Sequence, residues 1–175
     1  MNKFVLITGA GGQDAYFTSR YIKRNTNYSL YGISNNDYSK YLGTESLKFF
    51  DYFEKLSLCQ HEKLSQLINN INPTYIFNFG AVAGSLTQFN EPSKLIETNS
   101  LSILNILETL KSSKLKTKFI QASSSEIFAS NNEFKQQISS LRKPRTIYGA
   151  SKIFSDSLIE VYRKQYDVTV LAQFF

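Results

Sequence analysis

Short apolar runs alternate with amphipathic segments along most of the chain. Six runs have the length and composition of buried strands: Lys3–Thr8, Ser29–Ser34, Lys55–Leu58, Tyr75–Phe79, Lys118–Ala122 and Thr169–Phe174. Between them, helical spacing of apolar residues covers Ala15–Lys23, Glu62–Asn70, Glu91–Lys111 and Tyr148–Tyr166. The segment Asn35–Tyr52 has no clear period, and we expect it to be loop with at most one helical turn.

This alternation predicts an α/β fold with a doubly wound parallel sheet, the Rossmann fold, in the strand order 3-2-1-4-5-6. The pair Asn72-Pro73 is expected to end a helix just before a strand. At 175 residues the chain is expected to form one domain over residues 1–175. A chain of this length buries roughly 70% of its unfolded surface.

Composition excludes several classes of protein. Hydrophobic residues make up 42% of the chain and charged residues 19%, as in ordinary globular proteins. The net charge is +6, but the basic residues are scattered apart from Arg142-Lys143-Pro144-Arg145, so we expect no nucleic-acid partner. One cysteine, Cys59, excludes an internal disulfide, and one histidine, His61, argues against a metal site. The first apolar run is too short for a signal peptide or a membrane span, which predicts a cytoplasmic protein with no membrane partner.

A glycine-rich turn, Gly9-Ala10-Gly11-Gly12-Gln13-Asp14-Ala15, follows the first predicted strand and opens the first predicted helix. Such a turn lets the backbone approach a pyrophosphate, which then faces the helix N-terminus. The sequence therefore predicts a dinucleotide site that includes Gly9, Gly12, Gln13 and Asp14.

The ends of two other strands extend this predicted site. After the second strand, an acidic residue holds the ribose of NAD, whereas an arginine accepts the 2′-phosphate of NADP. Here the chain reads Ser34-Asn35-Asn36-Asp37, where Asp37 lies a little late for the acidic role and no arginine stands in the other place. The residues thus leave NADP and NAD both open. The fourth strand ends in Phe79-Gly80-Ala81, and we add Asn35, Gly80 and Ala81 to the cofactor-binding set.

Four residues form a candidate catalytic set: Ser124, Glu126, Tyr148 and Lys152. Tyr148 and Lys152 lie four positions apart and so share one face of a helix. The ammonium is expected to lower the phenol pKa from its usual ~10 towards neutral. Ser124 and Glu126, near a strand end, supply a hydrogen-bond donor and a second base. The plain alternatives are an ordinary amphipathic-helix pair and a solvated carboxylate.

Several motifs resemble the extended short-chain dehydrogenase/reductase superfamily, and within it the GDP-mannose 4,6-dehydratase family. They are Thr8-Gly9 with Gly12-Gln13-Asp14, Asn72-Pro73-Thr74, Gln121-Ala122-Ser123-Ser124-Ser125-Glu126, and Pro144-Arg145-Thr146-Ile147-Tyr148-Gly149-Ala150-Ser151-Lys152. The resemblance runs from Met1 to Phe175, the first half of such an enzyme, and ends before its substrate-binding domain. It implies NADP as cofactor, with NAD as the alternative, a nucleotide-sugar substrate such as GDP-mannose, and a homodimer.

The resemblance also implies roles for the four candidate residues. Tyr148 takes the proton from the sugar 4-hydroxyl, Ser124 hydrogen-bonds the 4-oxygen, and Lys152 holds the ribose, so Tyr148 and Lys152 also contact the cofactor. Glu126 removes the carbon-5 proton so that water leaves from carbon 6. A glutamate two residues after the serine favours a dehydratase over an epimerase. Asn35-Asn36, where an arginine pair is expected, departs from the family and puts the NADP preference in doubt.

The expected activity of these 175 residues alone is weak or absent, because the second half would supply the groups that grip the nucleotide diphosphate. Two alternatives remain. One is a non-catalytic dinucleotide-binding module, and the other is a different nucleotide-sugar epimerase or dehydratase of the same superfamily.

Overall fold

The computed structural model describes residues 3–36, 47–82, 90–128 and 135–173. Within these ranges one six-stranded parallel sheet has the order β3-β2-β1-β4-β5-β6. Its strands are β1 (Phe4–Thr8), β2 (Ser29–Ser34), β3 (Tyr52–Lys55), β4 (Tyr75–Asn78), β5 (Lys118–Ala122) and β6 (Val170–Gln173). The predicted doubly wound topology is confirmed.

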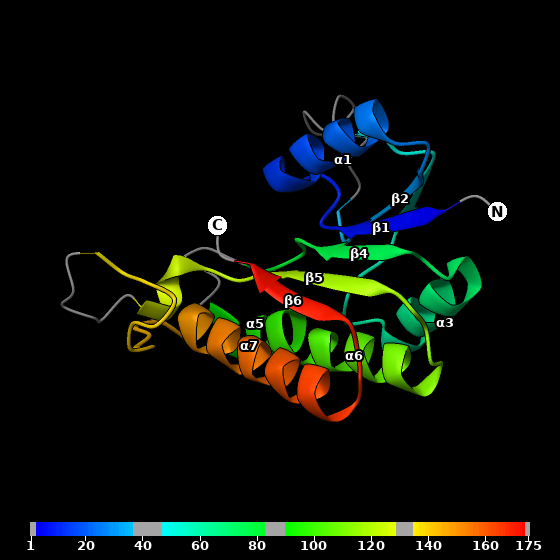
Figure 1. Cartoon of the computed structure of the whole chain (residues 1–175). Coiled ribbons are helices and arrows are strands. Elements are labelled where there is room, and N and C mark those ends of the chain that lie inside the picture. Colours follow the sequence, from blue (N-terminus) through cyan, green and yellow to red (C-terminus); the bar gives the residue numbers. More distant parts are fainter. Residues whose placement is uncertain (1–2, 37–46, 83–89, 129–134, 174–175) are drawn as a thin grey trace.

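The helices cover both faces of this sheet (Figure 1). On one face lies α1 (Gln13–Asn25), and on the other lie α3 (His61–Ile71), α5 (Pro92–Ile96), α6 (Ser102–Ser112) and α7 (Ile147–Gln165). The helix α3 ends where expected: Asn72 follows it in a left-handed conformation (φ 43°), with its N–H bonded to the Ile68 carbonyl. The described residues also include two short elements, a π-helical turn η2 (Glu97–Leu101) and a 3₁₀ turn η3 (Ser125–Phe128).

Alternate residues of β1 belong to two different hydrophobic cores. Val5 and Ile7 pack with Ile22 of α1, whereas Leu6 packs on the opposite face. Burial on both faces explains why this strand reads as a continuous apolar run rather than an alternating one. The larger core lies under α3, α6 and α7 and includes Leu64, Ile68, Ile76, Ile106, Phe119 and Ile159.

The third strand lies three residues earlier than its predicted position at Lys55–Leu58. All four side chains of β3 are exposed, because this strand forms the edge of the sheet. Leu56 and Leu58 are buried, but they follow the strand and pack into the core from the next loop. The apolar residues from which a strand was predicted therefore lie just after the end of β3.

The predicted helix Glu91–Lys111 is interrupted. The structure divides it into α5, the π-helical turn η2 and α6. Isolated π-helical turns occur often at functional sites, because they redirect side chains within an otherwise regular helix. This one places Asn99 and Ser100 in the protein interior.

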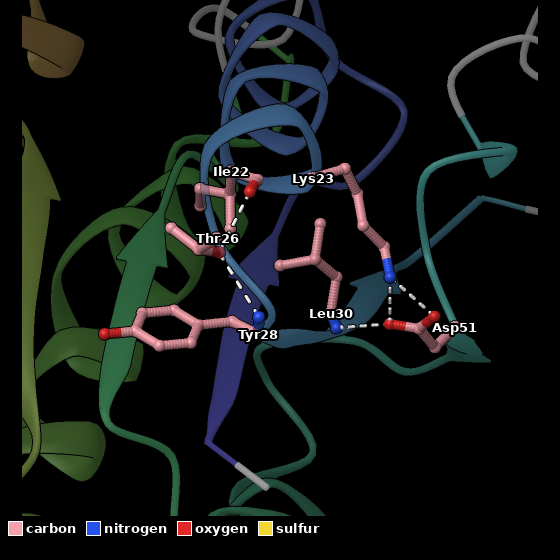
Figure 2. Close-up of polar contacts among 6 residues, drawn as sticks. All are labelled: Ile22, Lys23, Thr26, Tyr28, Leu30 and Asp51. Atoms are coloured by element: carbon pink, nitrogen blue, oxygen red, sulfur yellow. Dashed lines mark hydrogen bonds and ion pairs between the residues drawn. The ribbon is translucent and has the colours of Figure 1, made fainter.

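An ion pair ties the edge of the sheet to α1 (Figure 2). Both carboxylate oxygens of Asp51, which directly precedes β3, lie 2.6 Å from Lys23 Nζ. Asp51 Oδ2 also accepts a hydrogen bond from the Leu30 backbone N–H at 2.7 Å. Burial by itself would raise the pKa of this carboxyl, but the bonds from Lys23 and Leu30 lower it below its ordinary value.

Among the described residues, no helix is long and apolar enough to cross a bilayer. The same residues contain no cluster of three or more side chains suited to holding a metal ion.

Candidate active site

The glycine turn after β1 brings two backbones into direct contact. Gly9 has φ +63°, and a Cβ atom at this position would lie 2.8 Å from the Gly80 nitrogen and 2.9 Å from its Cα. Only glycine meets both demands without strain. The Gly12 N–H closes the turn on the Gly9 carbonyl at 2.8 Å, and Gly12 then caps the N-terminus of α1.

A cavity of about 330 Å³ opens beside this turn, where β1, β2 and β4 end. Five of the predicted cofactor-binding residues line it: Gly9, Gly12, Asn35, Gly80 and Ala81. Ser34, Asn36, Leu58 and Cys59 complete much of the wall on the β2 and β3 side. Gln13 and Asp14 lie exposed in the first turn of α1 and are not part of the lining. Asp37, the candidate ribose ligand, lies outside the described residues.

This cavity has the features that a dinucleotide needs. Its turn has no side chain at Gly9 or Gly12, Gly12 caps the N-terminus of a 13-residue helix, and its walls combine polar residues such as Asn35 and Ser57 with apolar residues such as Leu56 and Phe79. Helix N-termini with open backbone N–H groups bind phosphates. The residues present therefore fit a dinucleotide.

Three buried polar side chains form a ladder across the sheet behind the cavity. Thr8, Asn78 and Gln121 lie at the same level of β1, β4 and β5, and each is at most 1% exposed. The Thr8 hydroxyl donates to Asn78 Oδ1 and accepts from the Gly80 N–H at 2.9 Å. Asn78 Nδ2 donates to Gln121 Oε1 at 2.6 Å, and Gln121 Nε2 donates to the Ala122 carbonyl at 2.7 Å. The ladder connects the glycine turn to the end of β5.

The start of α7 packs tightly on η3. Thr146 caps this helix, its Oγ1 accepting from the Gly149 N–H at 3.0 Å. A Cβ atom on Gly149 would lie 2.7 Å from the Glu126 carbonyl oxygen, so glycine permits this close approach. The contact brings the first turn of α7, which carries Tyr148, against the turn that carries Glu126.

Three of the candidate catalytic residues meet at this contact. Tyr148 is half-buried, and its hydroxyl shares a hydrogen bond with the Ser124 hydroxyl. Ser124 Oγ also accepts from the Glu126 N–H at 3.3 Å. The Glu126 carboxylate lies close enough for its charge to act on Tyr148. The structure thus gathers the phenol, the hydroxyl and the carboxylate in one place.

The pKa of Tyr148 is raised, which differs from the expected lowering by Lys152. Burial is the main cause, and the negative charge of Glu126 adds to it, while the hydrogen bond with Ser124 acts in the opposite direction. Lys152 Nζ lies 5.5 Å from the centre of the Tyr148 ring and is directed elsewhere. In this arrangement the Lys152 ammonium does not lower the pKa of the Tyr148 phenol.

Lys152 is itself almost completely buried, with 2% of its surface exposed. Its Nζ donates to the carbonyl of Ala122 at 2.8 Å. Burial lowers the pKa of Lys152 to about 8, because a low dielectric disfavours the ammonium, and the charge of Asp156 opposes this effect.

Asn99 of η2 is a part of this region that sequence reasoning missed. Its side-chain amide pairs with the backbone of Val82, Nδ2 donating at 2.9 Å and Oδ1 accepting at 2.7 Å. The Asn99 carbonyl accepts from Ser155 Oγ of α7 at 2.7 Å. Asn99 therefore holds the chain just after Gly80 and Ala81 next to the helix of Tyr148. Its position inside a long predicted helix gave no signal of these contacts.

Comparison with known proteins gives concordant results. A family model described as GDP-mannose 4,6 dehydratase matches residues 6–175. The GDP-mannose 4,6 dehydratase of Dictyostelium discoideum is 28% identical over 184 residues, covering 95% of this chain and 50% of that protein. The GDP-mannose 4,6-dehydratase of Vibrio cholerae serotype O1 is 27% identical, covering 96% of this chain and 48% of that protein. The chain spans about half the length of the curated relatives it matches.

Among solved structures, the UDP-glucose 4-epimerase from Brucella ovis in complex with NAD superposes with a TM-score of 0.85. It is 16% identical, with 98% of this chain and 51% of that chain covered, so the likeness concerns the fold alone. The family model, by contrast, covers nearly the whole sequence. The chain therefore belongs to the GDP-mannose 4,6-dehydratase family.

Proposed function

We propose that the protein is the cofactor-binding half of a nucleotide-sugar 4,6-dehydratase that converts GDP-mannose to GDP-4-keto-6-deoxymannose. One observation carries the proposal: the Ser124 hydroxyl and the Glu126 carboxylate both act on the Tyr148 phenol. An epimerase needs the phenol and the hydroxyl, but a dehydratase also needs a second base for the sugar. Membership of the family supports the same assignment.

The cofactor in this proposal is NADP, with NAD as the alternative. A nicotinamide dinucleotide supplies a hydride acceptor that returns the hydride within the same turnover. Gly9 and Gly12 leave the backbone of the turn open to the pyrophosphate, and the N-terminus of α1 favours its charge. Asn35, which lines the cavity, is the proposed contact to the adenosine ribose, and Gly80 and Ala81 add little side-chain bulk at the sheet edge. The exposed Gln13 and Asp14 act at the mouth of the site.

Tyr148 and Ser124 act on the sugar 4-hydroxyl. The phenolate of Tyr148 takes the hydroxyl proton, and Ser124 donates a hydrogen bond to the 4-oxygen as the ketone forms. Because the Tyr148 pKa is raised in this structure, its deprotonation requires positive charge that arrives with the bound cofactor. Lys152 holds the cofactor ribose and orients the reacting groups.

Glu126 performs the elimination. The 4-ketone acidifies the carbon-5 hydrogen, which Glu126 removes as a proton. Glu126 passes this proton to the hydroxyl of carbon 6, which leaves as water, and a double bond forms between carbons 5 and 6. The hydride returns to carbon 6, and carbon 5 receives the proton that Tyr148 took from the 4-hydroxyl, which completes the 6-deoxy product. The protons therefore balance within one turnover with a single carboxylate close to the phenol.

The remaining features of the proposal concern partners and setting. GDP-mannose is the expected substrate, the expected assembly is a homodimer, and the expected location is the cytoplasm, with no nucleic-acid partner. Since the chain spans about half the length of its relatives, turnover by these 175 residues is expected to be weak or absent. Cofactor binding is expected to persist, because the cavity is formed within them.

The test measures binding and product separately. Calorimetry with NADP and with NAD establishes whether the cavity binds a dinucleotide and which one. Prolonged incubation with NADP and GDP-mannose, followed by mass spectrometry, then looks for a product lighter by one water. The variant Glu126→Gln is expected to abolish that product and to retain cofactor binding, while the matched variant Glu160→Gln, at an exposed carboxylate of α7, should not affect either.

The outcomes separate the candidate functions. A mass-neutral stereoisomer of GDP-mannose would show an epimerase and remove Glu126 from its proposed role. Cofactor binding without any product, even when the second half of a relative is supplied as a separate chain, would favour a binding module. Absence of binding to either dinucleotide would reject the proposal.

A further inference from the structure

Asp156 is a buried carboxylate to which the steps above give no role. It lies on α7 one helical turn after Lys152, and 5% of its surface is exposed. Oδ2 accepts a hydrogen bond from Ser123 Oγ at 2.9 Å and lies 4.0 Å from Arg142 Nη1. The other oxygen, Oδ1, is buried and has no hydrogen-bond partner in the described part of the chain.

A role in stability alone does not account for this group. Its distance to Arg142 is at the limit of an ion pair, and the Arg142 side chain is 36% exposed, so that pair contributes little. A buried carboxylate with one unpaired oxygen is costly. Burial accordingly raises the pKa of Asp156, while Ser123, Arg142 and Lys152 act to lower it.

Lys152 is the neighbour whose charged form this carboxylate stabilises. Residues four apart on a helix share one face, and these two contact consecutive residues at the end of β5. Lys152 bonds the Ala122 carbonyl, and Asp156 bonds the Ser123 hydroxyl. An ammonium that is 2% exposed requires a nearby negative charge to remain protonated.

We propose that Asp156 is a positioning residue for Lys152: its buried carboxylate, one helical turn away, keeps the ammonium charged and on the Ala122 carbonyl. The electrostatic coupling between Asp156 and Lys152 does not depend on the proposed function. Its importance for cofactor binding rests on the proposal that Lys152 holds the cofactor ribose.

Among the described residues, few charged groups face this pair. Arg142, from the segment before α7, faces Asp156, and Ser123 faces it from the end of β5. Tyr148 faces Lys152 from the same helix, and Glu126 of η3 acts on Tyr148. Asp156 is therefore the charged residue whose removal is expected to change the electrostatic potential at Lys152 most.

The test follows the ionisation of Lys152 by NMR. The Cε resonance of Lys152, assigned by its loss in Lys152→Met, is titrated in the wild type and in Asp156→Asn. The wild-type midpoint is expected at about 8, and the Asn variant is expected to lower it. Glu160→Gln, which removes an exposed carboxylate of the same helix, is the matched control and should leave the midpoint unchanged. An unchanged midpoint in a folded Asp156→Asn variant overturns the proposal.

A second measurement needs no variant protein. The Cγ resonance of Asp156 in the wild type must report an ionised carboxylate at pH 7, and a protonated group there refutes the coupling even if Asp156→Asn fails to fold.

Binding of NADP separates the two proposals. At pH 8 the protonated fraction of Lys152 should fall in Asp156→Asn from about a half in the wild type, and NADP binding should weaken in the same proportion if only the ammonium holds the ribose. A shifted midpoint with unchanged NADP affinity would leave the Asp156–Lys152 coupling intact and remove Lys152 from its proposed cofactor role.

Discussion

The Lys152 ammonium donates its hydrogen bond to the Ala122 carbonyl, 2.8 Å away at the end of β5, and not to the Tyr148 phenol. This bond attaches α7 to the sheet at the same residue that receives Gln121 Nε2. The Lys152 ammonium, whose charge burial disfavours, thus lies where the ladder of Thr8, Asn78 and Gln121 meets α7.

The first prediction concerns the pH dependence of stability. The folded-state pKa of Lys152, about 8, lies below its ordinary value of 10.5, so between these values the unfolded state binds more protons. The free energy of unfolding of the wild type, relative to Lys152→Met, should therefore rise as pH increases from 8 to 10.5, by up to about 3 kcal/mol. Urea denaturation of both proteins measures this difference. A flat difference, or one that falls with pH, contradicts it.

The second prediction concerns the glycine turn. Gly9→Ala forces a Cβ atom against the Gly80 backbone at a positive φ, and we expect a loss of about 2–4 kcal/mol in unfolding free energy. The control is Gly12→Ala, at φ −77°, whose Cβ would meet the Gly9 carbonyl at 3.2 Å. That variant should lose under about 1 kcal/mol yet bind dinucleotide more weakly. Equal stability of the two variants would contradict the contact between Gly9 and Gly80.

The third prediction concerns the ladder of Thr8, Asn78 and Gln121. Thr8→Val keeps the shape of the side chain but leaves the Gly80 N–H and the Asn78 amide oxygen each without this partner. We expect a loss of about 1–3 kcal/mol, measured by chemical denaturation. Thr169→Val, at an exposed threonine beside β6, is the control and should change stability by under about 0.5 kcal/mol. A neutral Thr8→Val variant would show that the ladder adds nothing to stability.

The fourth prediction concerns the clamp between Asp51 and α1 (Figure 2). Asp51→Ala removes the acceptor of the Leu30 N–H and the ion pair with Lys23, and should cost about 1–2 kcal/mol at pH 7. Asp51→Asn keeps an acceptor and should cost less. Because the Asp51 pKa is lowered in the folded state, its contribution is present above its ordinary value of 3.8 and is lost as pH falls through the folded value. Denaturation at pH 7 and at pH 3 should show the gap between wild type and Asp51→Asn closing in acid.

The sheet order could be predicted from the sequence because five of the six strands are apolar and separated by helical patterns. The bounds of the edge strand β3 could not, since its aromatic residues Tyr52 and Phe53 are exposed and the buried Leu56 and Leu58 follow the strand. The break in the long helix was also invisible, because a π-helical turn differs from the helix around it by its hydrogen bonds and not by a recognised sequence motif.

The residues of the candidate site likewise include some that could be predicted from the sequence and some that could not. Local motifs named the residues around Tyr148 and the glycine turn, since their chemistry depends on short spacings. Asn99 and Asp156 escaped notice because their partners lie 17 and 33 residues away. The raised pKa of Tyr148 could not be foreseen either, because it depends on burial and on the direction taken by the Lys152 side chain.

The turn η2 contains one more residue than a regular helix would accommodate between its flanking segments. Deletion of that residue would restore a regular helix and leave the two flanking segments in register, because the bulge already absorbs the additional residue. The backbone at Asn99 would then follow regular helical geometry, which would disturb its contacts with Val82 and Ser155. The additional residue is therefore not needed for the helix itself, and its consequence is the connection that Asn99 makes between the end of β4 and α7.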